Sequence, residues 1–527
     1  MKLTLAQVNP LVGDLDGNLD LVRSARDKAA DSDLVIFPEL VLSGYPPEDL
    51  VLKPVFLEEV RKRVDMLVRE SAGKPAILVT APWLEGHKRY NAALLIADGA
   101  IAGKVYKHTL PNYGVFDEMR VFHAGPLPAP LDFKGYKLGV MICEDMWSPT
   151  VAAHLKEQGA DILIVPNGSP FETGKHDTRL HHARLRIEET GLPLSYVNQV
   201  GGQDSLVFDG GSFVLARDCS LVRHAPFFKT HGETLSLPFD DRRVDEGWSE
   251  DDGHLYRALC LGTRDYVVKN GFAKGVLVGL SGGIDSALVA AIAIDALGAD
   301  KVHCVMMQSA FTSDESLADA RDCARRLGVS YEEIAIAPGM EAFEIMSPGL
   351  IGLAHENIQS RLRGNILMAL SNRTGRMVLT TGNKSEMACG YATLYGDMCG
   401  GYNPLKDIYK SRVYALARWR NKQGDAIPQN IIDKAPSAEL RPNQTDQDSL
   451  PPYDVLDDIL ECLIERDMDV AAITERGHDP AVVRRVWNLL DLAEYKRRQS
   501  APGPKVTARA FGPDRRYPIT SGFKQKY

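Results

Sequence analysis

The sequence predicts an α/β protein made of two domains, and three observations support this. Short β-branched runs alternate with helical stretches from the start of the chain to about residue 240. An acidic stretch without hydrophobic periodicity follows, and the alternation then restarts. At 527 residues the chain is too long for one compact core. We therefore expect one domain at 1–240, a linker at 241–256 and a second domain at 257–527.

The predicted strands of the first domain are short apolar runs that end near Gly, Pro or Asn. Helical stretches such as Leu19–Ala30 and Val151–Gln158 fall between some of them. The clearest strands are Leu34–Phe37, Ala76–Thr80, Leu138–Ile142, Ile162–Val165, Leu194–Val197 and Ser212–Leu215.

The second domain opens with a strand–helix–strand pattern. Gly275–Leu280 is an apolar strand, Asp285–Leu297 is an Ala-rich helix that Gly298 ends, and Val302–Met307 is the next strand. Near the end of the chain, Pro436–Asp454 is rich in Pro, Asn, Gln and Asp. This composition predicts a long surface loop, and such loops often act as lids.

The composition is that of an ordinary globular protein, with 44% hydrophobic and 25% charged residues. The first eight residues alternate like a strand and lack the apolar core of a secretory signal, so we expect a cytoplasmic protein without a membrane partner. A net charge of −9 argues against nucleic acid as the main partner. The eight cysteines include no CxxC pair, so free thiols are expected and a zinc site is not.

Three reactive side chains follow predicted strands of the first domain. Glu39, Lys107 and Cys143 each lie at or just past a strand end, where sites collect in open α/β folds. The three groups suit attack on an amide: a carboxylate takes the thiol proton, the thiolate adds to the carbonyl, and an ammonium stabilises the oxyanion. A cysteine at a strand end is also often a small buried apolar residue, so the residues alone leave both roles open.

The words around these residues resemble the nitrilase, or carbon-nitrogen hydrolase, superfamily. They are Phe37-Pro38-Glu39-Leu40, Tyr106-Lys107-His108-Thr109-Leu110-Pro111 and Cys143-Glu144-Asp145-Met146-Trp147. The resemblance covers residues 1 to about 240 and implies a four-layer αββα sandwich. It also implies Glu39 as general base, Lys107 as oxyanion stabiliser, Cys143 as nucleophile and Glu118 as an orienting glutamate. The glutamine-using branch further implies glutamine binding by Tyr113, Ser169 and Lys175.

A phosphate-binding loop is predicted at the start of the second domain. The run Gly279-Leu280-Ser281-Gly282-Gly283-Ile284-Asp285-Ser286 lies between an apolar strand and a helix, where backbone N–H groups can hold a phosphate. No Lys follows the glycines, so the run is not a Walker A motif. Asp285 beside a phosphate makes sense if it holds Mg²⁺.

Ser-Gly-Gly-x-Asp-Ser resembles the signature of the N-type ATP pyrophosphatases, whose domain is a doubly wound parallel sheet. Further words resemble the NAD synthetases within that superfamily: Asn357–Arg363, Thr380–Glu386, Tyr395-Gly396-Asp397, Asn403–Lys406 and Tyr495–Gln499. The resemblance implies ATP contacts from Thr381 and the loop, and Mg²⁺ held by Asp285 and Glu386. It implies a deamido-NAD site lined by Asn357, Glu386, Tyr391, Ala392, Thr393, Leu394 and Lys496.

One position departs from the family pattern. Leu394 stands where the shorter, ammonia-dependent synthetases have a lysine, so contacts with the substrate at this position are in doubt. The basic run Lys496–Arg498 also has a second interpretation, as the end of a helix whose dipole favours cations.

Together the two halves predict one reaction. The first domain releases ammonia from glutamine, and the second uses ATP to adenylate the carboxylate of deamido-NAD, which ammonia then converts to the amide. Because free ammonia would be protonated in neutral water, a shielded path between the sites is expected. The resemblance also implies a homo-oligomer.

Two rival functions stay open on the sequence. The second domain could adenylate another substrate, such as a nucleotide base or tRNA, although the absence of a CxxC pair disfavours sulfur transfer. Alternatively, the chain could be an amidase with a nucleotide-sensing module, against which the intact Asp285 and Glu386 count. A scaffold protein is a poorer fit, because the two catalytic motifs would then have no function.

Overall fold

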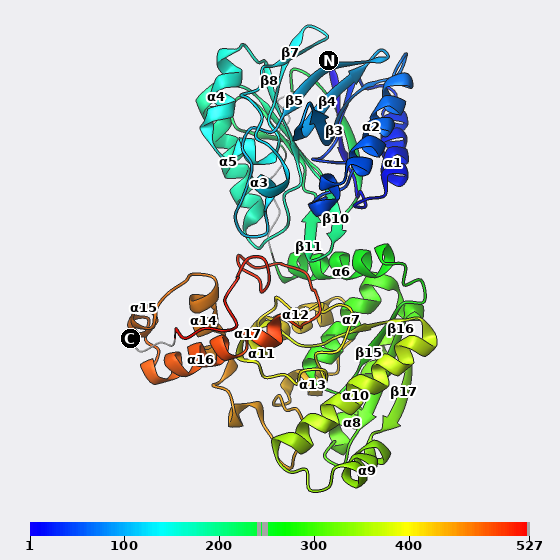
Figure 1. Cartoon of the computed structure of the whole chain (residues 1–527), viewed down its shortest axis with the longest axis vertical. Coiled ribbons are helices and arrows are strands. Elements are labelled where there is room, and N and C mark those ends of the chain that lie inside the picture. The colour runs from blue at the N-terminus through cyan, green and yellow to red at the C-terminus, as the bar shows by residue number, and fades with distance from the viewer. Residues whose placement is uncertain (240–243, 245–250, 524–527) are drawn as a thin grey trace. The chain divides into compact units, whose positions relative to one another are not determined.

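The computed structural model describes residues 1–239, 244 and 251–523. The chain divides into two compact units, Met1–Ser249 and Glu250–Tyr527 (Figure 1). The expected linker 241–256 falls largely outside the described residues, and its last five residues already belong to helix α6 (Asp252–Lys269). None of the helices in the described ranges combines the length and the apolar character needed to cross a membrane.

The first unit is built on two six-stranded sheets. One has the strand order β14-β1-β2-β3-β4-β5 and the other β13-β12-β9-β8-β7-β6. The first sheet comprises β14 (His231–Ser236), β1 (Lys2–Gln7), β2 (Leu34–Ile36), β3 (Ala76–Glu85), β4 (Lys88–Ala97) and β5 (Ala100–Tyr106). The second comprises β13 (Leu221–His224), β12 (Phe213–Leu215), β9 (Leu194–Asn198), β8 (Ile162–Asn167), β7 (Tyr136–Val140) and β6 (Leu131–Phe133).

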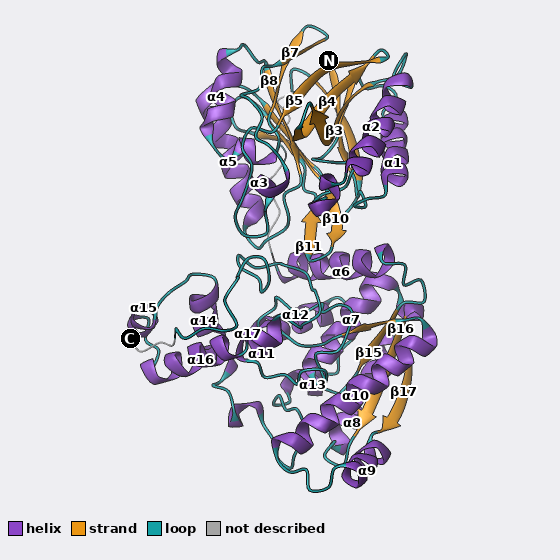
Figure 2. Ribbon diagram, in the orientation of Figure 1, coloured by secondary structure: helices purple, strands orange, loops and turns teal. Residues whose placement is uncertain are grey.

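Helices cover the outer faces of both sheets, which gives four layers (Figure 2). Residues from both sheets, such as Leu34 and Ile162, share one central apolar cluster. The outer face of the first sheet packs against α1 (Leu15–Lys28) and α2 (Pro54–Arg69). That of the second packs against α4 (Pro149–Glu157) and α5 (Lys175–Thr190). The αββα sandwich expected from the nitrilase resemblance is therefore confirmed.

Three short elements and a hairpin complete the unit. They are η1 (Glu48–Leu52), α3 (Glu118–Val121), η2 (Cys143–Met146), and the hairpin of β10 (Val200–Gln203) and β11 (Leu206–Asp209). All six strands proposed from the sequence are present, with ends shifted by a few residues. The strand before Cys143 stops at Val140 because the chain turns there.

The second unit contains a four-stranded parallel sheet in the order β17-β16-β15-β18. Its strands are β15 (Val276–Gly279), β16 (Val302–Gln308), β17 (Ser330–Ala335) and β18 (Met377–Leu379). The chain moves outward from β15 to β17 and then returns to β18 on the other side of β15. The carboxyl end of β15 is therefore the point where the strand order reverses, the usual ligand site of such sheets.

Helices pack around this sheet. α7 contacts β15 and β16, α8 contacts β16 and β17, and α10 contacts β15 and β18. A separate helical cluster includes α11, α14, α15 and α16. The helices of the unit are α6 (Asp252–Lys269), α7 (Ile284–Leu297), α8 (Asp314–Leu327), α9 (Ala337–Met346), α10 (Leu353–Thr374), α11 (Lys384–Cys389), α12 (Lys410–Lys422), α13 (Gln429–Asp433), α14 (Tyr453–Ile464), α15 (Val470–Glu475), α16 (Pro480–Leu492) and α17 (Glu494–Arg497), with short 3₁₀ turns η3 (Ala299–Lys301) and η4 (Asp446–Asp448).

Candidate active sites

Cys143 lies at a sharp turn directly after β7 and begins η2. Its φ of 48° is in the left-handed region, which non-glycine residues adopt only where the surroundings enforce it. The side chain is 3% exposed. Burial, with Glu39 nearby, raises the pKa of the thiol well above its usual value, so the resting thiol is protonated.

Lys107 brings the predicted catalytic groups together. It follows β5, and its Nζ lies 2.7 Å from Oε1 of Glu39 and 2.8 Å from Oε1 of Glu118. All three side chains are buried. Burial alone disfavours the ammonium, but the charges of Glu118 and Glu39 outweigh it and raise the pKa of Lys107 well above its usual value.

The carboxylate of Glu39 is held from several sides. Besides Lys107, Nδ2 of Asn91 donates to Oε1 at 2.7 Å and the backbone N of Gly168 donates to Oε2 at 3.0 Å. Glu118 in turn accepts a hydrogen bond of 2.9 Å from the hydroxyl of Tyr45. Burial raises the pKa of Glu118 to about 7. The site is thus a buried, hydrogen-bonded network in which Lys107 joins Glu39 to Glu118.

Asp145 connects the turn that carries Cys143 to the segment that carries Lys107. Its carboxylate accepts hydrogen bonds from the backbone N of Ile142 at 3.0 Å, of His108 at 3.1 Å and of Thr109 at 2.7 Å. It lies inside the quoted Cys143–Trp147 motif, but no role was predicted for it. Because it binds both segments, it fixes the distance between nucleophile and ammonium.

The predicted glutamine-binding residues have different environments. The ring of Tyr113 is 52% exposed, and its hydroxyl donates to Oε2 of Glu144 at 3.0 Å. Nζ of Lys175 lies 4.7 Å from the centroid of the Trp147 ring. Ser169 is buried, and its Oγ accepts a hydrogen bond from Nε of Arg179 at 3.1 Å. Glu144, next to the nucleophile and linked to Tyr113, is a site residue that the sequence prediction missed.

In the second unit, the predicted phosphate loop follows β15 and leads into α7. Gly282 has a φ of 81°, and a Cβ at this position would lie 2.4 Å from the backbone oxygen of Ser316. The backbone N of Ser281 donates to Oγ of Ser286 at 3.2 Å, and this hydroxyl donates to the carbonyl of Gly283 at 2.9 Å. The loop is therefore preorganised, as binding of a phosphate requires.

Asp285 and Glu386 converge on one ammonium group. Lys410, at the start of α12, forms an ion pair with Asp285, and its Nζ lies 3.5 Å from Oε1 of Glu386. Asn383 donates to Oδ1 of Asp285 at 2.9 Å. Burial and the neighbouring Asp285 raise the pKa of Glu386 to about 8. Lys410 was not identified from the sequence, because nothing in its local pattern distinguishes it from a solvated lysine.

The two carboxylates form a donor set of hard oxygens that suits Mg²⁺. Their convergence on a cationic group indicates that this position favours positive charge. Within the described ranges, no group of three or more His, Cys, Asp or Glu side chains is arranged to hold a metal ion. A cation here would therefore need phosphate oxygens or water to complete its coordination.

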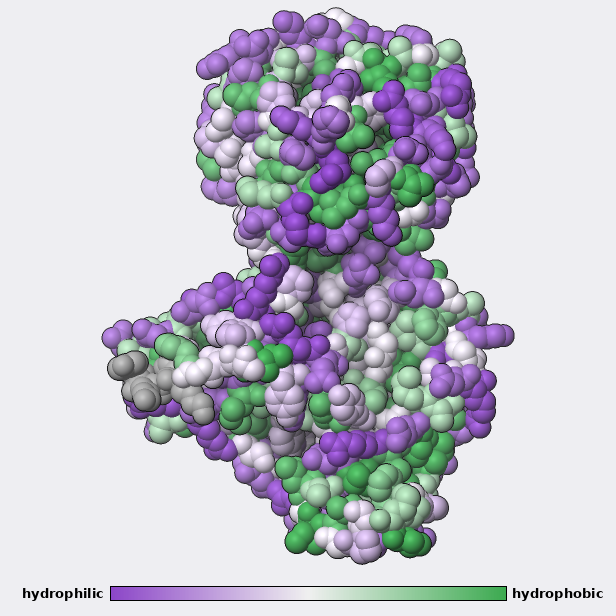
Figure 3. Space-filling view, viewed as in Figure 1, coloured by the Kyte–Doolittle hydropathy of each residue, from purple (hydrophilic) through white to green (hydrophobic). Residues whose placement is uncertain are grey.

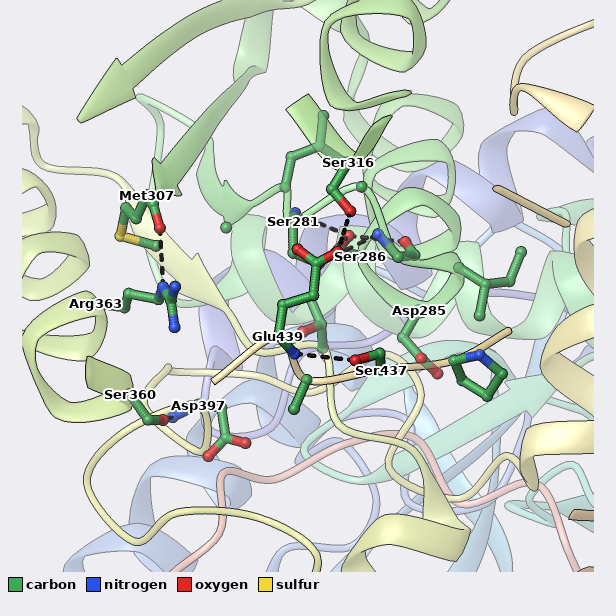
Figure 4. Close-up of a pocket in the computed structure, with 18 of the residues that line it drawn as sticks. Ser281, Asp285, Ser286, Met307, Ser316, Ser360, Arg363, Asp397, Ser437 and Glu439 are labelled. Carbon is green, nitrogen blue, oxygen red and sulfur yellow. Dashed lines mark hydrogen bonds between the residues drawn. The ribbon is translucent and has the colours of Figure 1, made fainter. Parts of the chain in front are cut away.

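A cleft of about 270 Å³ opens at the carboxyl end of the sheet (Figure 4). It is lined by the whole loop 279–286 and by Thr381, Glu386 and Tyr391. The first part of the predicted surface loop also lines it, from Pro436 to Leu440. Oε1 of Glu439 accepts hydrogen bonds of 2.8 Å from the hydroxyls of Ser313 and Ser316, which holds this loop against α8.

The other predicted deamido-NAD residues do not line this cleft. Asn357 accepts a hydrogen bond of 2.9 Å from the hydroxyl of Thr393, and the carbonyl of Leu394 accepts one of 3.2 Å from Nε of Arg361. Lys496 donates to the carbonyls of Gly390 and Ala392 at 2.8 Å. The structure thus joins these residues into one loop region beside the cleft.

Comparisons with known proteins cover both units. Residues 2–236 match the carbon-nitrogen hydrolase family and residues 255–500 match the NAD synthase family. A glutamine-dependent NAD(+) synthetase of Rhodobacter capsulatus is 49% identical over 100% of this chain and 99% of its own length. One from Acinetobacter baylyi is 44% identical over 99% of both chains.

A solved structure of similar length gives the same result. Glutamine-dependent NAD+ synthetase from Acinetobacter baumannii, in complex with adenosine diphosphate, superposes with a TM-score of 0.78 at 41% identity, over 98% of each chain. A synthetase from Cytophaga hutchinsonii shares the fold, with a TM-score of 0.84 at 23% identity.

Proposed function

Because this chain belongs to the glutamine-dependent NAD(+) synthetase family, we propose that the Cys143 site releases ammonia from glutamine and that the cleft at the phosphate loop consumes it. The reaction is that of a carbon-nitrogen ligase: ATP activates deamido-NAD as an adenylate, and ammonia from glutamine displaces AMP. The full-length similarity favours this function over the rival assignments raised from the sequence.

In the first unit, Glu39 accepts the thiol proton as Sγ of Cys143 attacks the amide carbon of glutamine. Lys107 stabilises the negative charge that develops on the carbonyl oxygen. Glu39 then returns the proton to the leaving nitrogen, which departs as ammonia and leaves a thioester. Water activated by Glu39 hydrolyses the thioester to glutamate and restores the thiol. The observation that supports this assignment is the placement of Lys107 between two buried carboxylates.

Glutamine recognition is assigned to the residues around the nucleophile. Glu144 and Tyr113 form a hydrogen-bonded acidic pair suited to the α-ammonium group, and Lys175 supplies a cation suited to the α-carboxylate. Gly168, which precedes Ser169, donates its backbone N–H to Glu39. This hydrogen bond links the segment of Ser169 to the catalytic carboxylate. This pattern of one acid and one base favours a free amino acid over a simple amide.

In the second unit, the phosphates of ATP are assigned to the N–H groups and hydroxyls of Ser281–Ser286, and Thr381 contacts the same nucleotide. Asp285 and Glu386 would hold Mg²⁺, which would neutralise the phosphates and favour departure of pyrophosphate. Lys410 balances the two carboxylates and lies where it can also contact phosphate oxygens. The nucleotide complex of the Acinetobacter baumannii synthetase supports a nucleotide site in this fold.

Deamido-NAD is assigned to the region formed by Asn357, Tyr391–Leu394 and Lys496, next to Glu386. Lys496 positions the loop through its hydrogen bonds to Gly390 and Ala392. At Leu394, where the shorter synthetases have a lysine, the backbone carbonyl rather than a cation faces Arg361.

Assembly into a homo-oligomer in the cytoplasm completes the proposal. An exposed apolar surface supports self-association: Ile345, Met346, Ile351 and Leu353 are 81%, 68%, 82% and 71% exposed. Ile345 and Met346 end α9, Ile351 lies in the segment before α10, and Leu353 begins α10. Figure 3 shows hydrophobic residues gathered over α9. A second copy that covered this surface would stabilise it. Light scattering of the wild type and of Ile345→Glu would test this assembly.

The proposed division of labour is tested with Cys143→Ala. NAD formation is measured from deamido-NAD and MgATP, with either glutamine or ammonium chloride as the nitrogen source. We expect the variant to lose the glutamine-driven reaction by more than about 10³-fold and to keep the ammonium-driven one. Loss of both reactions in a folded variant would contradict the assignment.

A further inference from the structure

One end of the nucleotide cleft is apolar. It is formed by Val305, Met306, Met307, Leu367 and Leu379. This end begins directly at the phosphate loop, because a Cβ on Gly279 would lie 3.3 Å from Cε of Met307 and 3.4 Å from Cδ1 of Leu367. A nucleotide whose phosphates lie on Ser281–Ser286 would therefore place its base at this apolar end.

Arg363 provides a cation at this apolar end. It lies on the face of α10 that lines the cleft, together with Ser360, Gly364 and Leu367, at the i, i+3, i+4 and i+7 positions of a helix. Its Nε donates to the carbonyl of Met307 at 2.9 Å, and Figure 4 shows the guanidinium on the opposite side of the cavity from Ser281 and Ser286. This bond fixes the orientation of the guanidinium plane.

The rest of the guanidinium is unpaired. Among the residues that the structure describes, no hydrogen bond or ion pair is formed by its two terminal nitrogens. Glu439 and Asp397 lie near enough to favour the charged form, yet burial outweighs them and lowers the pKa of Arg363. Arg497 shows the opposite case: its nitrogens bond to Glu494 and to the carbonyls of Leu490 and Ala388, as expected of a structural arginine.

We infer that Arg363 is the residue that binds the adenine base of ATP, with its guanidinium plane over the ring. A partly buried cation beside an apolar surface gains from the face of an aromatic base. The phosphates have their own donors on the other side of the cleft, so Arg363 is not needed for them. This inference rests on the proposed ATP site and adds the residue that recognises the nucleoside.

The test separates the base from the phosphates by using two inhibitors of the ammonium-driven reaction of the full chain. Adenosine carries the base alone, and inorganic pyrophosphate carries phosphates alone. For Arg363→Met, which keeps an apolar stem, we expect the KM for ATP and the inhibition constant for adenosine to rise about 10- to 30-fold. Inhibition by pyrophosphate should stay within about twofold, which also shows that the phosphate loop is folded.

Arg363→Lys keeps the charge but loses the planar group, so we expect it to behave closer to Arg363→Met than to the wild type. Arg373→Gln, at the exposed end of the same helix, is the matched control and should match the wild type. The inference is overturned if Arg363→Met weakens inhibition by pyrophosphate as much as inhibition by adenosine. It is also overturned if the variant changes neither inhibition constant.

Ser286→Ala distinguishes failure of this inference from failure of the proposed ATP site. We expect this variant to weaken inhibition by pyrophosphate and to leave inhibition by adenosine within about twofold. If Ser286→Ala has its effect and Arg363→Met has none, only the role of Arg363 is wrong. If neither variant changes either inhibitor, ATP does not occupy this cleft and both assignments are wrong.

Discussion

Nζ of Lys107 lies 2.7 Å from Oε1 of Glu39, and neither side chain is exposed to solvent. Replacing Lys107 by Met leaves Glu39 and Glu118 as buried carboxyl groups without their cation. We expect glutamine hydrolysis to fall by about 10²-fold or more, with a loss of roughly 3–5 kcal/mol in stability. Steady-state glutaminase assays and urea unfolding measure the two effects.

Lys104→Met is the control for this prediction. Lys104 lies on β5, the strand that precedes Lys107, and forms an exposed ion pair of 2.9 Å with Glu85. Such exposed pairs contribute about 0–1 kcal/mol, so activity should hardly change. Equal losses in the two variants would contradict a specific role for Lys107.

Glu118 should make the first unit less stable as the pH rises from about 4.5 to 7. Its pKa is raised to about 7 by burial, so the folded protein binds this proton more tightly than the unfolded chain. The contribution to stability is complete below the unfolded pKa and is lost as the pH approaches 7, with a slope of up to about 1.4 kcal/mol per pH unit. Glu118→Gln should flatten that slope in urea unfolding at pH 5, 6 and 7.

Glu85, whose pKa is shifted in the opposite direction, provides the comparison. Hydrogen bonds from Lys104, Tyr106 and Trp83 lower the pKa of Glu85 to about 2. Its titration therefore lies below this pH window, and Glu85→Gln should leave the slope between pH 5 and 7 unchanged. A slope in Glu118→Gln that equals the wild-type slope would show that Glu118 does not hold the proton.

Gly282→Ala should damage ATP binding. Its φ of 81° strains an alanine, and the new Cβ would meet the backbone oxygen of Ser316 at 2.4 Å. The loop or α8 must shift, so we expect the KM for ATP to rise by about tenfold or more. At Gly283 the nearest atom would be Oγ of Ser281 at 3.4 Å, so Gly283→Ala should have a much smaller effect. The reverse order of KM values would argue against the phosphate loop.

Lys410→Met should abolish NAD formation with either nitrogen source. The substitution removes the ammonium that balances Asp285 and Glu386 and that lies where it can contact the phosphates. We expect kcat to fall by about 10²-fold or more while glutamine hydrolysis stays within about twofold. Lys422→Met, at the exposed end of the same helix, is the control. Normal ammonium-driven synthesis in Lys410→Met would refute the role.

The sequence predicted the groups that follow strands and missed those whose role depends on distant packing. Glu39, Lys107 and Cys143 follow β2, β5 and β7, so the sandwich brings them together from a pattern that is visible locally. Asn91 lies in the middle of β4 and Lys410 begins α12, and each acquires its partner only when distant elements meet. Their local sequence carries no sign of this.

The secondary structure likewise divides into elements that the local sequence predicted and features that it did not. Asp285–Leu297 was predicted almost residue for residue as α7, because its Ala-rich run ends at Gly298. The loop Pro436–Asp454 was predicted from composition. The composition did not predict that this segment contains η4 and the start of α14. The contact of Glu439 with Ser313 and Ser316 joins segments more than a hundred residues apart, which no composition indicates.

The pairing of β1 with β14 has a consequence for synthesis on the ribosome. Lys2–Gln7 and His231–Ser236 are adjacent strands, yet more than two hundred residues separate them in the chain. At 5–20 residues per second, β1 waits on the order of 10 to 40 s for β14 to be translated. During that time Leu3 and Leu5 belong to an incomplete sheet with an unpaired edge. The nascent first unit is therefore a natural client for chaperones that bind exposed strands, until residue 236 has emerged.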